Sequence, residues 1–365
     1  MSDKTALVAM SGGVDSSVAA SLMQAAGYAC TGVTMRLFRN EDIGRSAAHP
    51  CCSQADIDDA AEAAFQLDIP HFVADLTAPF RREVIDKFVR TYRQGGTPNP
   101  CIDCNRSMKF DRLLRLADEK GVDCVVTGHY ARIEYDEPSG RYLLKKALDE
   151  GKDQSYVLYM LTQAQLARVR FPLGGMRKAD VRAIAEARGL CNAKKHDSQD
   201  ICFVPDGDYG RFLEVCTGER GKEGPLLNTD GAVIGTHRGA ERYTLGQRRG
   251  LAVAAGERVY VVAKDISRNT VTLGPDAALY SRTFYADEVN WLSVPAPDRP
   301  LRCRAKVRYR QTEQPATAEA LDETHIRVDF DAPQRAITPG QAVVLYDGDT
   351  VLGGGTITKT EKETP

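Results

Sequence analysis

Two cysteines in the segment TPNPCIDCNRSMKF, Cys101 and Cys104, have the side chains best suited to covalent chemistry. A helix is expected to begin just after Cys104, and Arg106 and Lys109 follow closely. Because a helix N-terminus and nearby cations favour the thiolate, we expect a lowered thiol pKa here. A zinc site needs four ligands, and no second cysteine pair of this spacing is evident. A redox pair fits the spacing alone, but we favour a catalytic thiol that works with a distant cysteine.

The candidate partner is Cys202, in the segment HDSQDICFV (residues 196–204). The run ICFV also suits a buried strand whose cysteine only packs, and on the residues alone that interpretation is favoured. Cys51 and Cys52 are adjacent in a polar segment and could also be reactive. The other cysteines stand in or beside apolar runs and are expected to be packing residues: Cys30, Cys124, Cys191, Cys216 and Cys303.

The segment Ser11–Ser16 (SGGVDS) stands between a predicted strand, Thr5–Met10, and a predicted helix, Asp15–Ala26. Its two glycines allow a tight turn and a close approach to a ligand, and the helix N-terminus directs free N–H groups at the same point. An ordinary strand-to-helix turn would carry such residues for geometry alone. The GxxxxGK[ST] and GxGxxG patterns are absent here. SGGVDS closely resembles the pyrophosphate loop of enzymes that split ATP into AMP and pyrophosphate.

Strands and helices alternate through the first part of the chain, which predicts a parallel sheet with helices on both faces. The further strands are expected at Ala29–Met35, His71–Leu76 and Asp123–Tyr130, and the helices at Ser53–Leu67, Pro79–Arg93 and Lys109–Lys120, with a loop at Gly95–Asn105. Ligands bind beyond the carboxyl ends of such strands. Ser11, Met35, Cys104 and His129 lie at or just past these ends, so one site could gather them.

The pattern of residues differs in the later segments of the chain. We expect a hairpin at Arg132–Lys145, helices at Lys152–Leu161 and Lys178–Arg188, and a last buried strand at Ile201–Val204. Short alternating runs between turn residues follow from Leu226. The predicted class is therefore α/β: a parallel-sheet, adenine-nucleotide-binding domain (1–205), a small linking domain (206–278) and an all-β barrel (279–365).

Composition limits the partners. The 365 residues are 42% hydrophobic and 27% charged, as in a soluble globular protein, and no apolar run approaches the roughly 20 residues that span a bilayer. Without a secretion signal we expect a cytoplasmic protein with reduced thiols, monomeric when free and away from membranes. The formal net charge is −2, so any RNA binding must come from local patches.

Six motifs occur in a fixed order: SGGVDS, TPNPCxxCN, TGHYAR, GKDQSY, SQDICF and TPGQAVVLYDG. Together they resemble the tRNA-specific 2-thiouridylase family, which thiolates the wobble uridine of certain tRNAs, and the resemblance covers essentially the whole chain. It implies that Cys104 is the nucleophile and that Cys202 carries a persulfide. Cys101 stands where some members have an aspartate, so we expect it only to support the reaction.

The resemblance also implies two sets of binding residues. ATP would be bound by Ala9, Met10, Ser11, Gly12, Gly13, Val14, Asp15, Ser16, Met35 and Gly128. The tRNA would be bound by Asn99, Pro100, Cys101, His129, Lys152, Asp153, Gln154, Gln311, Thr312 and Gln341. Adenylation of the uridine would require ATP with Mg²⁺, and a cysteine desulfurase or relay protein would supply the persulfide sulfur.

The segment Leu301–Arg310 (LRCRAKVRYR) has a basic residue at every second position. As a strand it would place five cations, Arg308 and Arg310 among them, on one face. Such a face is costly unless acidic neighbours or a polyanion cover it. Acidic residues nearby could neutralise it, but beside the tRNA resemblance we favour RNA.

Three other functions stay open. An amidating ligase would use the SGGVDS loop without Cys104 or Cys202. An iron–sulfur tRNA thiolase would use Cys101, Cys104 and Cys202 as three cluster ligands. A non-enzymatic RNA-binding module would use only the C-terminal β domain.

Overall fold

The computed structural model describes residues 4–44, 52–195, 201–204, 206–251, 253 and 258–361. The predictions for Cys51 and for residues 196–200 lie outside these ranges, as does the side chain of Cys52. The chain forms two compact units. The first unit contains residues 1–85, 100–205 and 349–351, and the second contains residues 86–99, 206–348 and 352–365.

A five-stranded parallel sheet forms the centre of the first unit, in the order β3-β2-β1-β4-β7. Its strands are β1 (Thr5–Ala9), β2 (Ala29–Arg36), β3 (His71–Asp75), β4 (Cys124–Val126) and β7 (Val169–Arg170). A hairpin of β5 (Arg132–Asp136) and β6 (Arg141–Lys145) lies in the same unit, as predicted. The α/β class with a parallel sheet is thereby confirmed, and β7 is a strand that the sequence analysis missed.

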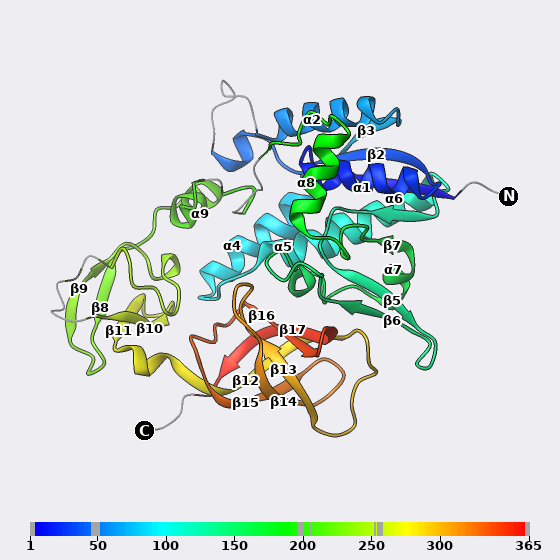
Figure 1. The fold of residues 1–365 in the computed structure, drawn as a ribbon. Helices are drawn as coiled ribbons and strands as arrows, with labels where there is room; N and C mark the ends of the chain where they lie inside the picture. The colour runs from blue at the N-terminus through cyan, green and yellow to red at the C-terminus, as the bar shows by residue number, and fades with distance from the viewer. Residues whose placement is uncertain are drawn as a thin grey trace. The chain divides into compact units, whose positions relative to one another are not determined.

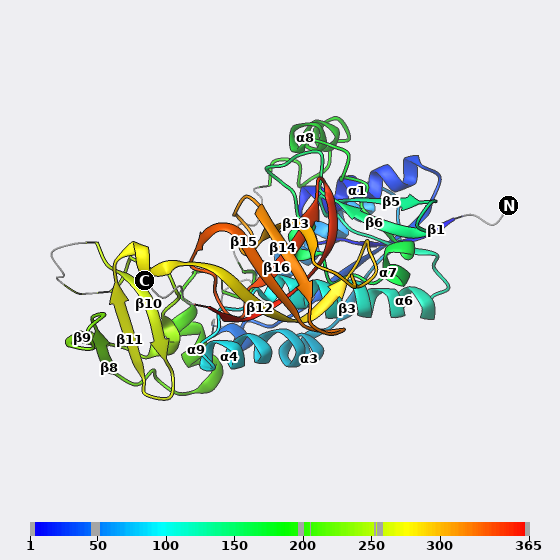
Figure 2. The same ribbon diagram turned by 90° about the horizontal axis from the view of Figure 1, so that it is seen from below.

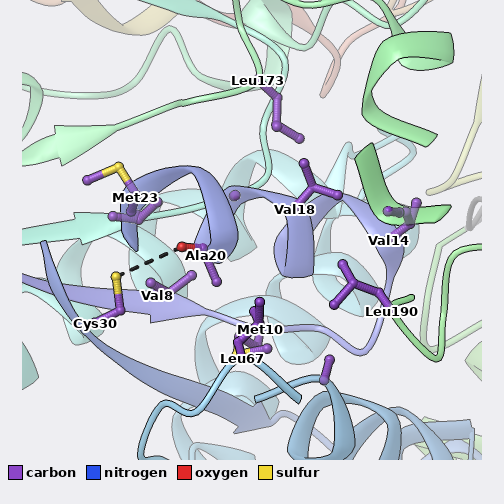
Figure 3. Close-up of a cluster of buried hydrophobic side chains, with 14 of the residues drawn as sticks. Val8, Met10, Val14, Val18, Ala20, Met23, Cys30, Leu67, Leu173 and Leu190 are labelled. Atoms are coloured by element: carbon purple, nitrogen blue, oxygen red, sulfur yellow. Dashed lines mark hydrogen bonds between the residues drawn. The ribbon is translucent and has the colours of Figure 1, made fainter. Parts of the chain in front are cut away.

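Helices connect these strands. They are α1 (Val14–Ala25), α2 (Cys52–Gln66), α3 (Thr77–Phe80), α5 (Pro100–Asp103), α6 (Leu113–Glu119), α7 (Gln163–Arg168) and α8 (Lys178–Ala187), with π-helical turns at Arg81–Ile85 and Cys104–Arg112 and 3₁₀ turns at Glu41–Ile43 and Ser155–Val157. Helices α1 and α8 pack against each other (Figure 1). The core around α1 includes Val8 of β1, Met10 just after that strand and Leu190 from the segment after α8 (Figure 3).

The predicted loop Gly95–Asn105 is wrong in its second half, where the chain is helical. Pro100 is the first residue of α5, a position that suits proline because the N–H it lacks would have no partner inside the helix. The helix continues through the π-helical turn Cys104–Arg112, and Met108 and Phe110 of this turn are fully buried. Burial of these apolar side chains explains why the segment is ordered as a helix.

Three other predicted elements differ. Strand β4 ends at Val126 and is followed by Thr127–Tyr130, hereafter the TGHY turn, in which the Tyr130 N–H donates to the Gln154 side chain at 3.0 Å. The predicted helix Lys152–Leu161 contains only the 3₁₀ turn, since the Asp153 carboxylate accepts the N–H groups of Ala147 and Ser155 at 2.9 and 3.2 Å. Ile201–Val204 is a turn rather than a strand, with the Val204 N–H bonded to the Ile201 carbonyl at 2.9 Å.

The second unit begins with helix α4 (Asp86–Arg93), which is the end of the predicted helix Pro79–Arg93. Aromatic side chains of α4 contact those of α9 (Tyr209–Thr217). The Phe88 and Phe212 ring centres lie 5.9 Å apart. A four-stranded sheet in the order β10-β11-β8-β9 follows. Its strands are β8 (Gly224–Leu227), β9 (Val233–His237), β10 (Tyr260–Asp265) and β11 (Thr270–Gly274), with 3₁₀ turns at Ala240–Arg242 and Asp276–Leu279.

The C-terminal strands close into a six-stranded antiparallel barrel, which confirms the predicted all-β domain. They are β12 (Tyr280–Trp291), β13 (Leu301–Lys306), β14 (Gln314–Ala320), β15 (Ile326–Arg335), β16 (Ala342–Asp347) and β17 (Thr350–Thr360). The order is β12-β15-β14-β13-β16-β17, and β12 also pairs with β17. Figure 2 labels the strands β12 to β16. The predicted boundaries between the three domains stay a prediction.

The basic alternation of Leu301–Arg310 is real but shorter than predicted, since β13 ends at Lys306. Arg302 forms an ion pair with Asp331, and Arg304 donates to the Glu313 backbone carbonyl at 2.7 Å. Arg308 lies beyond the strand and donates to the carbonyls of Leu245 and Ala336 and to the Thr338 hydroxyl at 3.2, 2.9 and 2.9 Å. The prediction that five cations lie on one continuous strand face is therefore wrong.

None of the helices in the described ranges has the length and apolar character that crossing a bilayer requires.

Replacing Gly12 with alanine should lower the free energy of unfolding by about 3 kcal/mol. The backbone at Gly12 has a φ of +71°, and an added Cβ would lie 2.2 Å from the Asp56 carbonyl oxygen. Gly27→Ala is the matched control, because its φ is +83° but nothing lies within 4 Å, so we expect a loss of only about 1 kcal/mol. Urea unfolding of both variants measures the difference. Equal losses would contradict the close packing at Gly12.

Candidate active site

The SGGVDS loop is built to receive an anion. The Ser11 N–H donates to the Ser16 hydroxyl at 3.1 Å, and that hydroxyl donates to the Gly13 carbonyl at 3.0 Å. Gly13 precedes the first residue of α1 with an extended backbone and has no side chain to cap the helix. The first N–H groups of α1 can therefore bind a phosphate.

Asp15 ties this loop to two other elements. Its carboxylate accepts bonds from the Lys178 ammonium at 2.7 and 2.8 Å and from the Tyr130 hydroxyl at 2.7 Å. Lys178 begins α8 and is buried. These bonds join the start of α1 to α8 and to Tyr130. The sequence analysis missed Lys178, since no motif marks a lysine 163 residues from its partner.

The segment after α8 also contacts the SGGVDS loop and the helices beside it. The Asn192 amide donates to the Gly12 carbonyl at 3.2 Å and to the Ser17 hydroxyl at 2.9 Å. The Lys195 ammonium lies 2.7 Å from Asp56 and 2.6 Å from Asp59, both on α2. Neither Asn192 nor Lys195 was predicted; Asn192 bonds the loop directly, whereas Lys195 bonds α2.

The other residues expected to bind nucleotide lie at the carboxyl ends of β1 and β2. Ala9 ends β1, Met10 follows it, and Val14 begins α1, all three buried. Met35 lies near the end of β2 and is half-buried. The sheet thus gathers these residues with the loop, while their contact with ATP stays a prediction.

Gly128 lies against the SGGVDS loop. A Cβ on Gly128 would stand 2.9 Å from both the Asp15 carbonyl carbon and the Ser16 nitrogen. Only a residue without a side chain can make this approach. The TGHY turn is therefore packed directly on the start of α1.

The thiols of Cys101 and Cys104 lie close enough to Cys202 to act on it electrostatically, and the structure has all three as thiols rather than as disulfides. Burial raises the pKa of the Cys104 thiol to about 11. Cys202 is exposed, yet loss of solvation raises the pKa of its thiol to about 12, with Cys104 and Cys101 adding to the rise. The buried-strand interpretation of Cys202 is wrong.

The expected lowering of the thiol pKa is also wrong. Loss of solvation raises the pKa of Cys101 as well as that of Cys104, and this effect outweighs the nearby Lys109, which acts in the opposite direction on both. Cys104 lies inside a continuous run of helix rather than at its first exposed turn. The sequence spacing correctly predicted that Lys109 lies near the thiols, but it could not predict that the thiols lose their solvation.

His129 is buried, and burial followed by the Lys109 charge lowers its pKa well below the usual range. The ring is therefore neutral. Its Nδ1 lies 2.7 Å from the Thr127 hydroxyl, and its Nε2 lies 3.5 Å from the Lys109 ammonium. Because an ammonium only donates, Nε2 accepts and Nδ1 carries the proton. Its expected contact with tRNA stays a prediction.

Lys152, Asp153 and Gln154 lie in a turn that supports the TGHY turn. The Tyr130 N–H donates to the Gln154 side chain at 3.0 Å, and the Gln154 N–H donates to the Tyr130 carbonyl at 2.9 Å. Asp153 accepts the Ser155 hydroxyl at 2.7 Å. Lys152 is half-buried. The Lys152 N–H donates to the Asp149 carbonyl at 2.9 Å, so all three residues have partners within the chain, and their predicted tRNA contacts are untested.

The remaining predicted tRNA residues divide between the units. Pro100 and Cys101 begin α5 in the first unit. In the second unit the Gln341 amide donates to the Thr97 carbonyl at 2.7 Å, two residues before the half-buried Asn99. The Gln311 amide donates to the Gln334 side chain at 3.1 Å. Arg310 and Thr312 are exposed.

The part of the chain that the structure describes contains no group of three or more His, Cys, Asp or Glu side chains placed to hold a metal ion.

Alkylation of Cys104 should accelerate by about tenfold per pH unit between about pH 7 and about pH 10. The reacting species is the thiolate, whose fraction rises with pH until the pKa of about 11 is reached. Iodoacetamide labelling followed by peptide mass spectrometry gives the rate. A plateau near neutral pH would mean that the thiol is already ionised and would contradict the effect of burial.

Comparison with known proteins agrees with this architecture. Residues 4–206 match the family described as tRNA methyl transferase HUP domain, residues 210–275 the tRNA methyl transferase PRC-barrel domain, and residues 281–357 the aminomethyltransferase beta-barrel domain. A solved 4-thiouridine synthetase–RNA complex with bound ATP covers 55% of this chain and 45% of that chain at 19% identity, with a TM-score of 0.35. That likeness is too distant to inform the site.

Curated relatives match over nearly the whole chain. The tRNA-specific 2-thiouridylase MnmA of Symbiobacterium thermophilum is 49% identical over 97% of this chain and 92% of the relative. That of Moorella thermoacetica is 49% identical over 96% of this chain and 98% of the relative, and that of Clostridioides difficile is 44% identical over 98% and 99%. With this identity, coverage and domain order, the chain belongs to the tRNA-specific 2-thiouridylase family.

Proposed function

We propose that this protein activates O2 of the wobble uridine of tRNA with ATP and replaces that oxygen with sulfur from a persulfide on Cys202. Family membership makes the chain a tRNA-uridine 2-sulfurtransferase. The adenylation step, the persulfide and the sulfur donor go further and are our proposal. A single observation carries it: Gly128 packs on the SGGVDS loop, and the next residue, His129, contacts Lys109 beside the thiols.

Activation is needed because the C2 oxygen of uracil leaves poorly. The pKa of water is about 15.7, so oxide or hydroxide is a weak leaving group. Transfer of AMP to this oxygen converts it into a phosphate ester, and the second pKa of a phosphate monoester is roughly 6. The N–H groups at the start of α1 would hold the released pyrophosphate.

Sulfur transfer then takes two steps. The terminal sulfur of the Cys202 persulfide attacks C2, and AMP leaves with the electron pair of the C2–O bond. The Cys104 thiolate next attacks the Cys202 sulfur, so that the S–S bond to the base breaks and its electron pair stays on the 2-thiouridine. Cys104 and Cys202 become a disulfide, which an external dithiol must reduce before another turnover.

Magnesium enters with ATP as its complex. The single acidic residue of the SGGVDS loop, Asp15, already accepts bonds from Lys178 and Tyr130. The nucleotide phosphates would therefore supply the ligands of the ion. A persulfide-bearing protein, either a cysteine desulfurase or a relay protein, would load Cys202.

An iron–sulfur mechanism makes a different use of Cys101, Cys104 and Cys202. The described residues give it no support, since they include no group of three suitable side chains placed for a metal. An absorbance spectrum of anaerobically purified protein distinguishes the two mechanisms. Visible absorbance bands together with stoichiometric iron and sulfide would support the iron–sulfur mechanism and refute the persulfide mechanism.

Changing either Cys104 or Cys202 to serine should abolish 2-thiouridine formation, by at least about a thousandfold, while tRNA-dependent formation of AMP from ATP continues. The adenylation step does not use the thiols, so it separates lost chemistry from lost structure. Cys191→Ser is the matched control, because Cys191 is exposed. Within the described residues, the contact of its sulfur is one with the Asp59 carbonyl. Nucleoside mass spectrometry measures the product. Full thiolation by either catalytic variant would refute the two-thiol mechanism.

Replacing Arg310 with glutamate should weaken tRNA binding and reduce the slope of log affinity against log salt by about 1 for each lost phosphate contact. Arg310 is exposed, whereas Arg308 already holds two carbonyls, so reversing Arg308 would also disturb packing. Arg268→Glu, in the exposed turn between β10 and β11, is the control. Filter binding at several salt concentrations gives the slope. If the Arg310 and control slopes match that of the parent, Arg310 does not contact tRNA.

A further inference from the structure

We infer that Lys109, held in place by neutral His129, is the cation that stabilises negative charge on the sulfurs of Cys104 and Cys202 during transfer. This inference rests on the proposed function and assigns a further catalytic residue to it. His129 is then a positioning residue, because it acts on the sulfurs only through Lys109.

The helical geometry places Lys109 beside the nucleophile. Residues Cys104–Arg112 form a π-helical turn, in which residue i bonds to residue i+5, and Lys109 is the fifth residue after Cys104. The same ammonium acts electrostatically on Cys101 and Cys202. One cation therefore serves three sulfurs that come from two distant parts of the sequence.

The need for a cation follows from burial. Loss of solvation raises the pKa of Cys104 and that of Cys202, so both sulfurs resist carrying charge. Asp103 and Cys101 raise the pKa of Cys104 further, since a second negative charge nearby is unfavourable. Lys109 is the group in this set that favours the thiolate. Without it the attack of Cys104 would require an isolated buried anion.

His129 suits the task of holding an ammonium. A protonated imidazole would repel Lys109, whereas the neutral ring offers Nε2 as an acceptor at 3.5 Å. With Nε2 accepting from Lys109, Nδ1 carries the proton and donates to the Thr127 hydroxyl at 2.7 Å. The rings of Phe110 and Phe171 lie 5.7 Å from the imidazole and fix its place. The bond to His129 uses one of three ammonium N–H groups.

The charge moves without a proton leaving Lys109. The Cys104 proton passes to water, the thiolate forms beside the ammonium, and its electron pair forms the bond to the Cys202 sulfur. The S–S bond to the base breaks, and its electron pair leaves on the 2-thiouridine. Lys109 exchanges no proton with the sulfurs in this scheme, so its contribution is electrostatic.

The test is the alkylation rate of each thiol in the full chain, without ATP or tRNA. Lys109→Met should slow iodoacetamide labelling of Cys104 and Cys202 by about tenfold at a pH near 8, the effect of a rise of about one unit in thiol pKa. Lys109→Arg keeps the charge and should stay within about threefold of the parent rate. His129→Asn should give an intermediate rate, because the ammonium is no longer held. Arg106→Gln, on the same π-helical turn, is the matched control.

Two outcomes would overturn the inference: parent-like labelling in Lys109→Met, or equal loss in Lys109→Met and Lys109→Arg, which would mean a steric role. Lys109→Gln is a second neutral variant should methionine prevent folding, which circular dichroism detects. The proposed function fails separately, if the parent protein makes no AMP and no 2-thiouridine with tRNA, ATP and a persulfide donor.

Discussion

The contact between Gly128 and the peptide that joins Asp15 to Ser16 is the constraint on which the site depends. Two loops from neighbouring parallel strands meet there with no side chain between them. From this point the TGHY turn extends both ways: Tyr130 bonds Asp15 of the SGGVDS loop, and His129 approaches Lys109 beside Cys104. The proposed activation of uridine and the proposed sulfur transfer are thereby supported by the same short turn.

Burial gives the thiols a property that sequence spacing does not suggest. Low-pKa cysteines react with any electrophile, whereas Cys104 and Cys202 are held mainly as thiols by loss of solvation. A site of this kind protects its nucleophiles until charge can be stabilised. Lys109, itself only half-buried, is the residue placed to do so.

Some basic side chains of the C-terminal barrel bond other protein groups, and others are exposed. Arg302 is paired with the Asp331 carboxylate on β15, Arg304 bonds the Glu313 carbonyl just before β14, and Arg308 bonds the backbone of loops. These contacts orient basic groups while reducing repulsion along β13. Arg310, past the end of the strand, is exposed. A net charge of −2 is thus compatible with local basic groups whose positions are defined.

The sequence by itself determined the elements whose signals are local: the alternation that predicts β1, α1 and β2, the glycines of the SGGVDS loop, and the cysteines that could react. Only the tertiary structure decided that Lys178 and Asn192 hold this loop, because such contacts join residues more than 160 positions apart. It also decided the pKa of Cys104, since solvation depends on every group packed around a sulfur and spacing reports only the neighbours along the chain.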